Sequence, residues 1–244
     1  INNSPIKYGN SLWGRYFHND GWLDNGYEIS VLYDDDPNLH IKNYFATGKT
    51  AIINSENLKL RAGASLSNSQ ANNDTSVSQV GASGEVRLLA KQGRFQFSSN
   101  NFYSTGYYAG LRKGVLNLIE KINYNNGKQN IWLGYNLLKF DPKSLVAQQN
   151  RFNQFFMQRV DVGASSRLEN VMLSVNPHHI SEWRNSFNFI DDEAVTYRME
   201  SYNLGIGINY SAVGSGHGFS LNFIGGHYSS NLFEKNKNHF KTTF

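Results

Sequence analysis

The stretch that decides the fold is YNLGIGINYS, Tyr202 to Ser211. Alternate positions are apolar or aromatic, and the positions between them carry Asn, Gly or Ser. The apolar set consists of Tyr202, Leu204, Ile206, Ile208 and Tyr210. A period of two places the two sets on opposite faces of a β-strand. The stretch therefore predicts a strand with one apolar face, and ~9–11 residues is the length that crosses a bilayer at a tilt.

The same period recurs along the chain. In residues 58–67, Leu58, Leu60, Ala62, Ala64 and Leu66 alternate with Lys59, Arg61, Gly63, Ser65 and Ser67. Shorter alternating runs occur near residues 27–34, 79–88, 131–137, 159–165 and 219–223. Few segments show a helical period. These patterns predict an all-β chain of roughly 12–14 antiparallel strands.

Turn signals separate the runs. Asp20-Gly21, Asn25-Gly26 and Asn126-Gly127 are two-residue hairpin signals, because Asn and Asp tolerate a positive φ and Gly adopts it freely. Polar stretches at 68–78, 139–150, 176–185 and 229–238 predict longer loops. Short turns that alternate with longer loops are typical of outer-membrane barrels.

Composition narrows the class of protein. The 244 residues predict a single β domain, 1–244, and 14% aromatic residues argue against disorder. The absence of cysteine excludes disulfides and Cys-ligated metals. No run approaches the ~18–20 apolar residues of a membrane-spanning helix. The chain begins at Ile1 without Met, so it is either a mature product or a fragment of a larger protein.

Alternation alone does not separate a transmembrane β-barrel from a soluble β-sandwich. In a barrel the apolar face meets lipid and the other face lines a lumen, whereas in a sandwich the apolar faces meet in a core. Two features favour the barrel. Small residues dominate several polar faces, and aromatic residues lie near the strand ends, as in interfacial girdles: Tyr27, Tyr33, Tyr124, Tyr202, Tyr210, Phe219 and Tyr228.

These patterns resemble Gram-negative outer-membrane β-barrels as a broad class. Phe240, Thr242 and Phe244 alternate at the end of the sequence, similar to the terminal-strand signal of such barrels. The resemblance implies an outer-membrane location and contact with membrane lipid, lipopolysaccharide and other envelope proteins. The run Phe97–Tyr108, followed by Gly110–Gly114, also resembles large export barrels, although neither a plug nor a helical repeat is evident. A fragment of such a barrel is the alternative.

Charged residues on the polar faces predict a lumen that biases the passage of solutes. The expected lumen-facing residues are Lys59, Arg61, Glu85, Arg87, Arg159 and Asp161. A net charge of +4 adds the expectation of polar or anionic solutes. The sequence thus predicts a pore or export channel for polar solutes or secreted polymer, without catalysis of its own. A soluble glycan-binding β-sandwich is one alternative, and the same charges would then lie on its water-exposed face.

Residues 226–231 contain a motif that resembles a catalytic residue pair. Its His-x-Ser pair is similar to that of outer-membrane lipid deacylases and phospholipases. The resemblance implies His227 as base and Ser229 as nucleophile. The orienting acid is missing from a convincing position, since Glu234 is the only acidic residue that follows. A lipid-modifying hydrolase is therefore a second alternative. A polar loop without a catalytic role also accounts for this sequence.

Other polar clusters do not predict a cofactor, a metal site or nucleic-acid binding. His178 and His179 are adjacent, so on a strand they point to opposite faces and do not share an ion; a polar loop is the expectation for them. The acidic runs at 34–36 and 191–193 lack the spacing of a calcium loop and predict solvated turns. No motif that combines basic and aromatic residues for nucleic acid is assembled.

Overall fold

The computed structural model describes residues 10–18, 26–36, 40–71, 78–110, 112–143, 154–188, 193–211, 218–231 and 237–243. These residues form strands and turns, without a helix. The strands are β1 (Asn10–His18), β2 (Tyr27–Asp36), β3 (Ile41–Asn54), β4 (Leu58–Ala71), β5 (Ser78–Gln92), β6 (Phe95–Ser104), β7 (Val115–Asn125), β8 (Gln129–Phe140), β9 (Gln154–Leu168), β10 (Val171–Asn188), β11 (Glu193–Ser211), β12 (Gly218–Ser230) and β13 (Lys237–Thr243).

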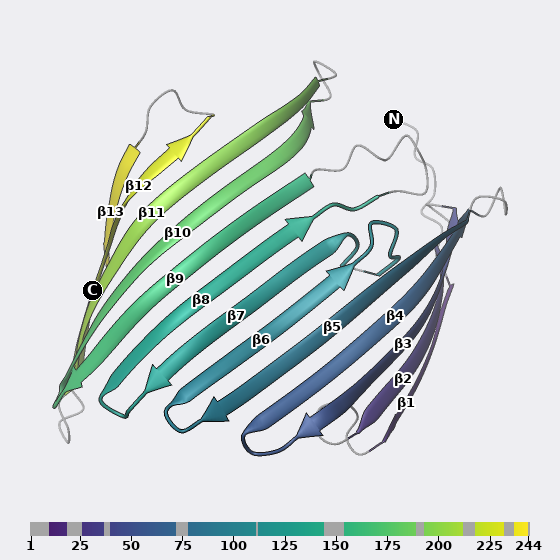
Figure 1. Ribbon diagram of the computed structural model, residues 1–244. Coiled ribbons are helices and arrows are strands. Elements are labelled where there is room, and N and C mark those ends of the chain that lie inside the picture. The colour runs from purple at the N-terminus through teal and green to yellow at the C-terminus, as the bar shows by residue number, and fades with distance from the viewer. Residues whose placement is uncertain are drawn as a thin grey trace. The chain divides into compact units, whose positions relative to one another are not determined.

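The strands form one sheet in sequence order, β1 to β13, so each hydrogen-bonds to its neighbours in the chain (Figure 1). This confirms the predicted all-β, antiparallel fold, and 13 strands lie within the expected range. The strand order is linear, and among the described residues β1 pairs with β2 and β13 pairs with β12. No helix in the described part of the chain is long and apolar enough to cross a membrane.

Between β3 and β10 the connections alternate in length, as predicted. Two or three residues join β3 to β4, β5 to β6, β7 to β8 and β9 to β10, whereas longer segments follow β4, β6 and β8. The Asn126-Gly127 turn is confirmed: Gly127 has φ +88°, and the Asn126 N–H donates to the Gln129 carbonyl at 3.1 Å. The other two hairpin signals are Asp20-Gly21 and Asn25-Gly26, and of these four residues only Gly26 lies within the described residues.

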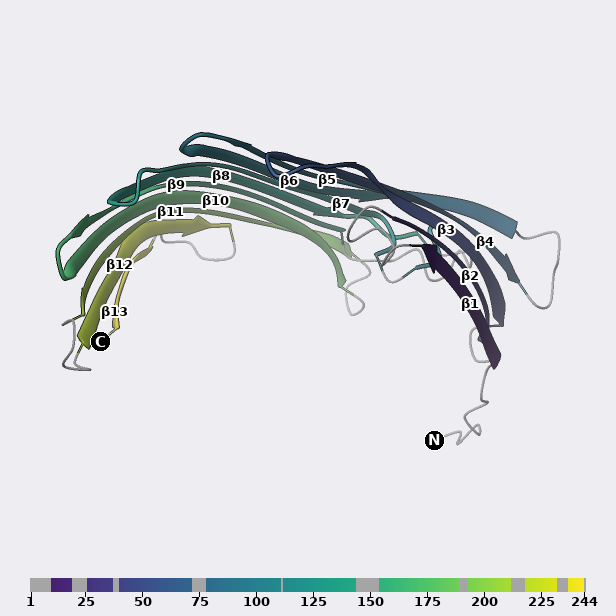
Figure 2. The ribbon, with the colours of Figure 1, turned by 90° about the horizontal axis from the view of Figure 1, so that it is seen from below.

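The chain divides into two compact units. Unit 1 comprises residues 1–88, 100–117 and 139–152, and unit 2 comprises residues 89–99, 118–138 and 153–244. Strands β1 to β4 lie side by side in unit 1, as β9 to β12 do in unit 2 (Figures 1 and 2).

Burial in unit 1 is the reverse of that in a soluble sheet. In β4, Leu66 is 61% exposed, whereas Ser65 and Ser67, on the opposite face, are 5% and 3% exposed. The register places Leu66 opposite Ala46 of β3, and Ala46 opposite Val31 of β2, which is also exposed. We call this surface the apolar face of unit 1, and the surface of Ser65 and Ser67 its polar face.

Unit 2 repeats the inversion in residues 202–211. Ile206 of β11 is 44% exposed, whereas Ser201, on the opposite face, is 7% exposed. Ile206 pairs with Val175 of β10 and with Phe223 of β12, and both are exposed with it. The alternation of residues 202–211 is therefore confirmed, with its apolar side outward. Trp13 and Ile224 depart from this pattern, being exposed on the polar faces.

The loop predicted at 176–185 is wrong, because these residues lie inside β10. Pro177 cannot donate a backbone hydrogen bond, which normally excludes proline from a central strand. Here the side-chain amide of Asn176 donates to the Val162 carbonyl at 2.9 Å and substitutes for the missing donor. The pairing of β9 with β10 is interrupted at Asn176 and Pro177 and resumes at His178 in the same register.

Other predicted loops are shorter than expected. Residues 68–71 belong to β4, 139–140 to β8, 229–230 to β12 and 237–238 to β13. The acidic run 34–36 completes β2 rather than forming a turn, and Asp34 accepts a hydrogen bond from the Ser11 hydroxyl at 2.7 Å. In each case the polar residues predict a loop or turn from the sequence, but a strand also accepts polar residues on its polar face.

Candidate functional site

The connection between β6 and β7 folds over the polar face of unit 1. We call residues 105–110 and 112–114 the inner segment; Leu111, between them, lies outside the described residues. The Tyr108 hydroxyl donates to Ser65 Oγ at 3.1 Å, and the Ala109 N–H donates to Ser67 Oγ at 3.0 Å. These contacts explain why two serines on a polar face are almost fully buried.

Gly81 of β5 lets the inner segment approach. A Cβ atom at this position would lie closer than 3.0 Å to the backbone of Tyr107 and Tyr108. Backbone atoms cannot yield as a flexible side chain does, so only glycine permits this packing. The close approach fixes the inner segment against β5.

Both ends of the inner segment are anchored. The Thr105 N–H donates to the Ala82 carbonyl at 2.9 Å, and the Ala82 N–H donates to Thr105 Oγ1 at 3.0 Å. At the other end, the Asp141 N–H donates to the Gly114 carbonyl at 2.7 Å. Ser104 is buried, accepts a hydrogen bond from the Val115 N–H and donates one to the Arg112 carbonyl. The inner segment is thus held by backbone bonds and not only by side chains.

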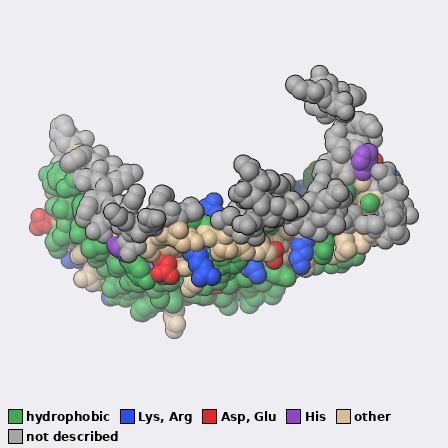
Figure 3. All heavy atoms as spheres, turned by 90° about the horizontal axis from the view of Figure 1, so that it is seen from above, with side chains coloured by type: hydrophobic (Ala, Val, Ile, Leu, Met, Phe, Trp, Pro, Cys, Tyr) green, Lys and Arg blue, Asp and Glu red, His purple; other side chains and the backbone are tan. Residues whose placement is uncertain are grey.

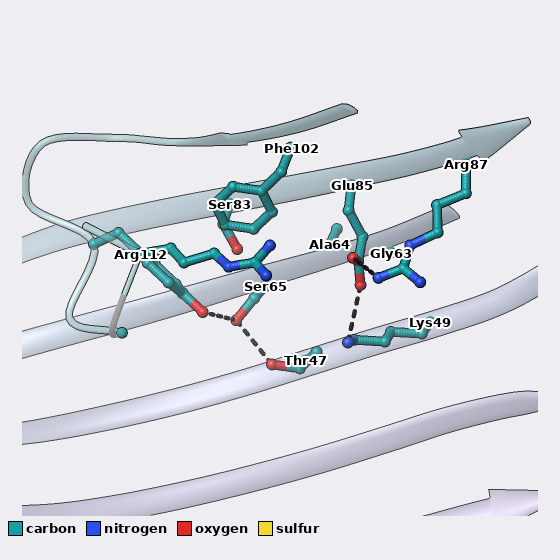
Figure 4. A pocket seen from close by; sticks show the side chains of 12 residues that line it. Thr47, Lys49, Gly63, Ala64, Ser65, Ser83, Glu85, Arg87, Phe102 and Arg112 are labelled. Atoms are coloured by element: carbon teal, nitrogen blue, oxygen red, sulfur yellow. Dashed lines mark hydrogen bonds and ion pairs between the residues drawn. The ribbon is translucent and has the colours of Figure 1, made fainter. Parts of the chain in front are cut away.

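A pocket of about 320 Å³ lies between the inner segment and strands β3 to β6 (Figure 4). Glu85 lines one side of the pocket, with an 11% exposed side chain. Lys49 Nζ lies 2.9 Å from one carboxylate oxygen of Glu85, and Arg87 Nη2 lies 3.4 Å from the other. Gly63, opposite Lys49 in the register, provides room, since its Cβ would meet the Lys49 and Glu85 side chains.

Arg112 brings a third cation to the pocket from the inner segment. Its guanidinium carbon lies 4.9 Å from the centre of the Phe102 ring, a cation–π contact. Figure 4 shows the Arg112 side chain reaching past Phe102 over the pocket. Three cationic groups and one carboxylate therefore line the pocket, and together they carry a net charge of about +2.

Hydroxyl groups and an aromatic ring form the other part of the pocket. Thr47 Oγ1 and Ser65 Oγ lie 2.8 Å apart, and the Tyr108 hydroxyl completes the chain. Phe45 supports the Tyr108 ring edge-to-face at 6.1 Å. The pocket thus joins a cationic end to a hydroxyl-rich end.

Lys113 adds further positive charge to the inner segment. Burial lowers the pKa of its ammonium group, because the charged form loses hydration. The chain therefore places a partly desolvated cation beside Arg112.

The predicted lumen residues lie in different places. Glu85 and Arg87 meet in the pocket of unit 1. Lys59 and Arg61 follow on the same face of β4, nearer the turn to β3, where Arg61 pairs in register with Ala51. Arg159 and Asp161 form a bidentate ion pair in unit 2, with Nη2 of Arg159 2.6 Å from Oδ1 of Asp161.

Sequence reasoning missed Lys49, Arg112 and Tyr108. Lys49 carries a usable signal, because Thr47 and Lys49 alternate with Ala46 and Gly48 as they would on a strand. The run of residues 106–114, with glycines flanking paired tyrosines, contains no sign that it packs inward. That placement depends on contacts with residues far away in the sequence.

His227 and Ser229 share the apolar face of unit 2, as the His-x-Ser spacing predicts. In the register His227 lies opposite Tyr202, and Ser229 lies opposite Glu200 of β11. Glu200 is an acidic residue that the sequence did not single out, because it is almost thirty positions earlier. It lies opposite the serine rather than the histidine, so the pairing only partly matches a catalytic triad.

The adjacent histidines behave as strand residues. His178 pairs with Asp161 and Asn203, whereas His179 pairs with Val160 and Tyr202, so the two rings point to opposite faces. His179 stacks on Tyr202 with ring centres 4.4 Å apart. In the described residues no cluster of three His, Asp or Glu side chains could hold a metal ion.

Comparisons with known proteins assign no family. Neither a protein-family model nor a curated protein sequence matches the chain. The function is therefore inferred from the geometry above.

Proposed function

We propose that this chain is a Gram-negative outer-membrane β-barrel, or part of one, that forms a passive pore for polar solutes. The observation that carries the proposal is the inverted burial in both units: apolar side chains such as Leu66 and Ile206 are exposed, while serines on the opposite face are buried. Soluble proteins rarely expose contiguous apolar surface on this scale. A bilayer supplies the missing apolar contact, and strands in a bilayer must close into a barrel.

The space-filling view supports this assignment. Hydrophobic side chains gather in a broad layer, with Lys, Arg, Asp and Glu side chains beside it (Figure 3). In the described part of the chain no large side chain is fully buried. A β-sandwich of this size would bury many in its core, so the soluble glycan-binding alternative is disfavoured.

Aromatic pairs mark the edges of the apolar face. In unit 2, Tyr210 stacks on Phe219 at 5.7 Å, and Tyr202 stacks on His179. Tyr202 and Tyr210 are eight residues apart on β11, a span of ~26 Å along an extended strand. Outer-membrane barrels carry an apolar band ~25 Å tall between two aromatic girdles. Because the strands of such barrels are tilted, the height that this span covers across the membrane is somewhat less than its length along the strand.

The inner segment supports a selective pore over a wide export channel. A closed barrel would enclose the polar face of unit 1, and the inner segment would then occupy part of the lumen. A lumen narrowed in this way passes small polar solutes and retards polymers.

Reconstitution tests the proposal. The purified chain in planar bilayers is expected to give discrete conductance steps, and the unheated protein is expected to migrate faster on a denaturing gel than the boiled protein. Both follow from a closed barrel that detergent alone does not unfold. A chain that purifies without detergent and shows neither behaviour would contradict the proposal.

A hydrolase acting on membrane lipid is the second candidate. The supporting observation is that His227 and Ser229 lie on the apolar face of unit 2, with Glu200 opposite Ser229 in the register, where a bilayer would bring lipid. The outer membrane would then supply the substrate as well as the location.

Ser229→Ala separates the two candidates. If Ser229 is the nucleophile, the variant is expected to lose all release of fatty acid from phospholipid or lipopolysaccharide, while conductance stays unchanged. Ser220→Ala on the same strand is the control, because Ser220 lies on the polar face opposite Asn209. Wild-type chain without lipase activity removes the hydrolase from consideration.

A further inference from the structure

We infer that the pocket of unit 1 binds small solutes that carry a carboxylate or phosphate group on a hydroxyl-bearing body, with sugar phosphates as the test case. The inference rests on the proposed pore only for how the solute arrives. Binding itself depends on the pocket.

The cationic end selects an anion. Glu85 engages Lys49 and Arg87 through separate oxygens, which holds both cations at one wall of the pocket. Their side chains remain 28% and 42% exposed, so a solute in the pocket can reach both cations. Guanidinium groups match carboxylate and phosphate oxygens in geometry, and charge-assisted hydrogen bonds are the strong ones.

Arg112 approaches the same space from the inner segment. The cation–π contact with Phe102 holds the Arg112 guanidinium at the pocket, where its N–H groups can donate to a bound anion. An anion between Arg112 and Arg87 would be held by both, while Glu85 prevents the site from becoming so basic that release is slow. Weak, reversible binding is what passage through a pore requires.

The hydroxyl-rich end recognises the rest of the solute. Thr47, Ser65 and Tyr108 form a chain of hydroxyl groups that both donate and accept hydrogen bonds. Sugar hydroxyls have the same dual character. A volume of about 320 Å³ is at the small end of ligand sites and fits one monosaccharide unit better than a polymer.

Two measurements on the full-length chain test the inference separately from the pore. Equilibrium binding in detergent is measured with glucose 6-phosphate, inorganic phosphate and glucose, and the block of ion current is measured in bilayers with the same solutes. Glucose 6-phosphate is expected to bind most tightly, phosphate more weakly and glucose least. Arg112→Gln is expected to weaken glucose 6-phosphate binding roughly tenfold through loss of a charge-assisted contact.

Arg87→Gln provides a second test from a different strand, and Arg167→Gln is the matched control, because Arg167 lies in unit 2 beside the turn to β10, where it donates to the Glu169 carbonyl. Equal affinity for glucose and glucose 6-phosphate would overturn the anion assignment, as would unchanged binding in both pocket variants. Phosphate binding as tight as glucose 6-phosphate would overturn the role of the hydroxyl-rich end. Binding without conductance would support the binding site and contradict the pore. Conductance without binding would support the pore and contradict the binding site.

Discussion

Gly81→Ala is expected to displace the inner segment and to raise single-channel conductance severalfold. The added Cβ would lie closer than 3.0 Å to the backbone of Tyr108, so the inner segment must move away from β5. That movement breaks the hydrogen bonds from Tyr108 and Ala109 to Ser65 and Ser67. In a pore, removing an inward segment widens the narrowest section, and current rises with it.

Gly84→Ala is the matched control for this change. It is the same substitution on the same strand, but its Cβ would meet only a carbonyl oxygen at 3.8 Å, an ordinary contact. Gly84→Ala should therefore leave conductance and thermal stability unchanged, whereas overpacking at Gly81 should lower stability by about 1–3 kcal/mol. Equal currents from both variants would mean that the inner segment does not narrow the pore.

The sequence alone could predict the strands, because the period-two signal is local. Residues 58–67 and 202–211 keep strict alternation, and the structure places each apolar set on one exposed face. The prediction of strands failed where polar residues occupy both alternating sets of positions. At 176–185 the histidines, Ser181 and Glu182 hid the period, and Pro177 suggested a break that the Asn176 side chain compensates.

The candidate site was only half predictable. Glu85 and Arg87 lie two residues apart, so their shared face follows from alternation. Lys49 reaches them from β3, and Arg112 from the inner segment, through contacts that depend on strand pairing and on the packing of Tyr108 against Gly81. The position of Glu200 could not be predicted from the sequence either, because only the register of β11 with β12 places it opposite Ser229.

Leu66→Arg tests the membrane environment most directly, and we expect it to reduce the free energy of unfolding by about 2–4 kcal/mol in lipid, the cost of a cation near the bilayer midplane of a β-barrel. Leu66 lies in a row with Ala46 and Val31, between the row of Tyr27 and the Tyr33–Tyr44 pair that mark the two edges of the apolar face.

The size of this effect separates lipid from water. On a soluble protein, arginine at a 61% exposed position meets water and costs almost nothing. Leu66→Phe is the apolar control and should be tolerated in lipid, while Asn57→Arg in the short turn after β3 introduces the same charge outside the apolar face. Urea unfolding in lipid vesicles measures all three. Destabilisation by Leu66→Arg alone requires a hydrocarbon solvent at that face, because neither added bulk nor added charge explains it, whereas equal stability of all three variants would place the apolar face in water and remove the basis for the pore.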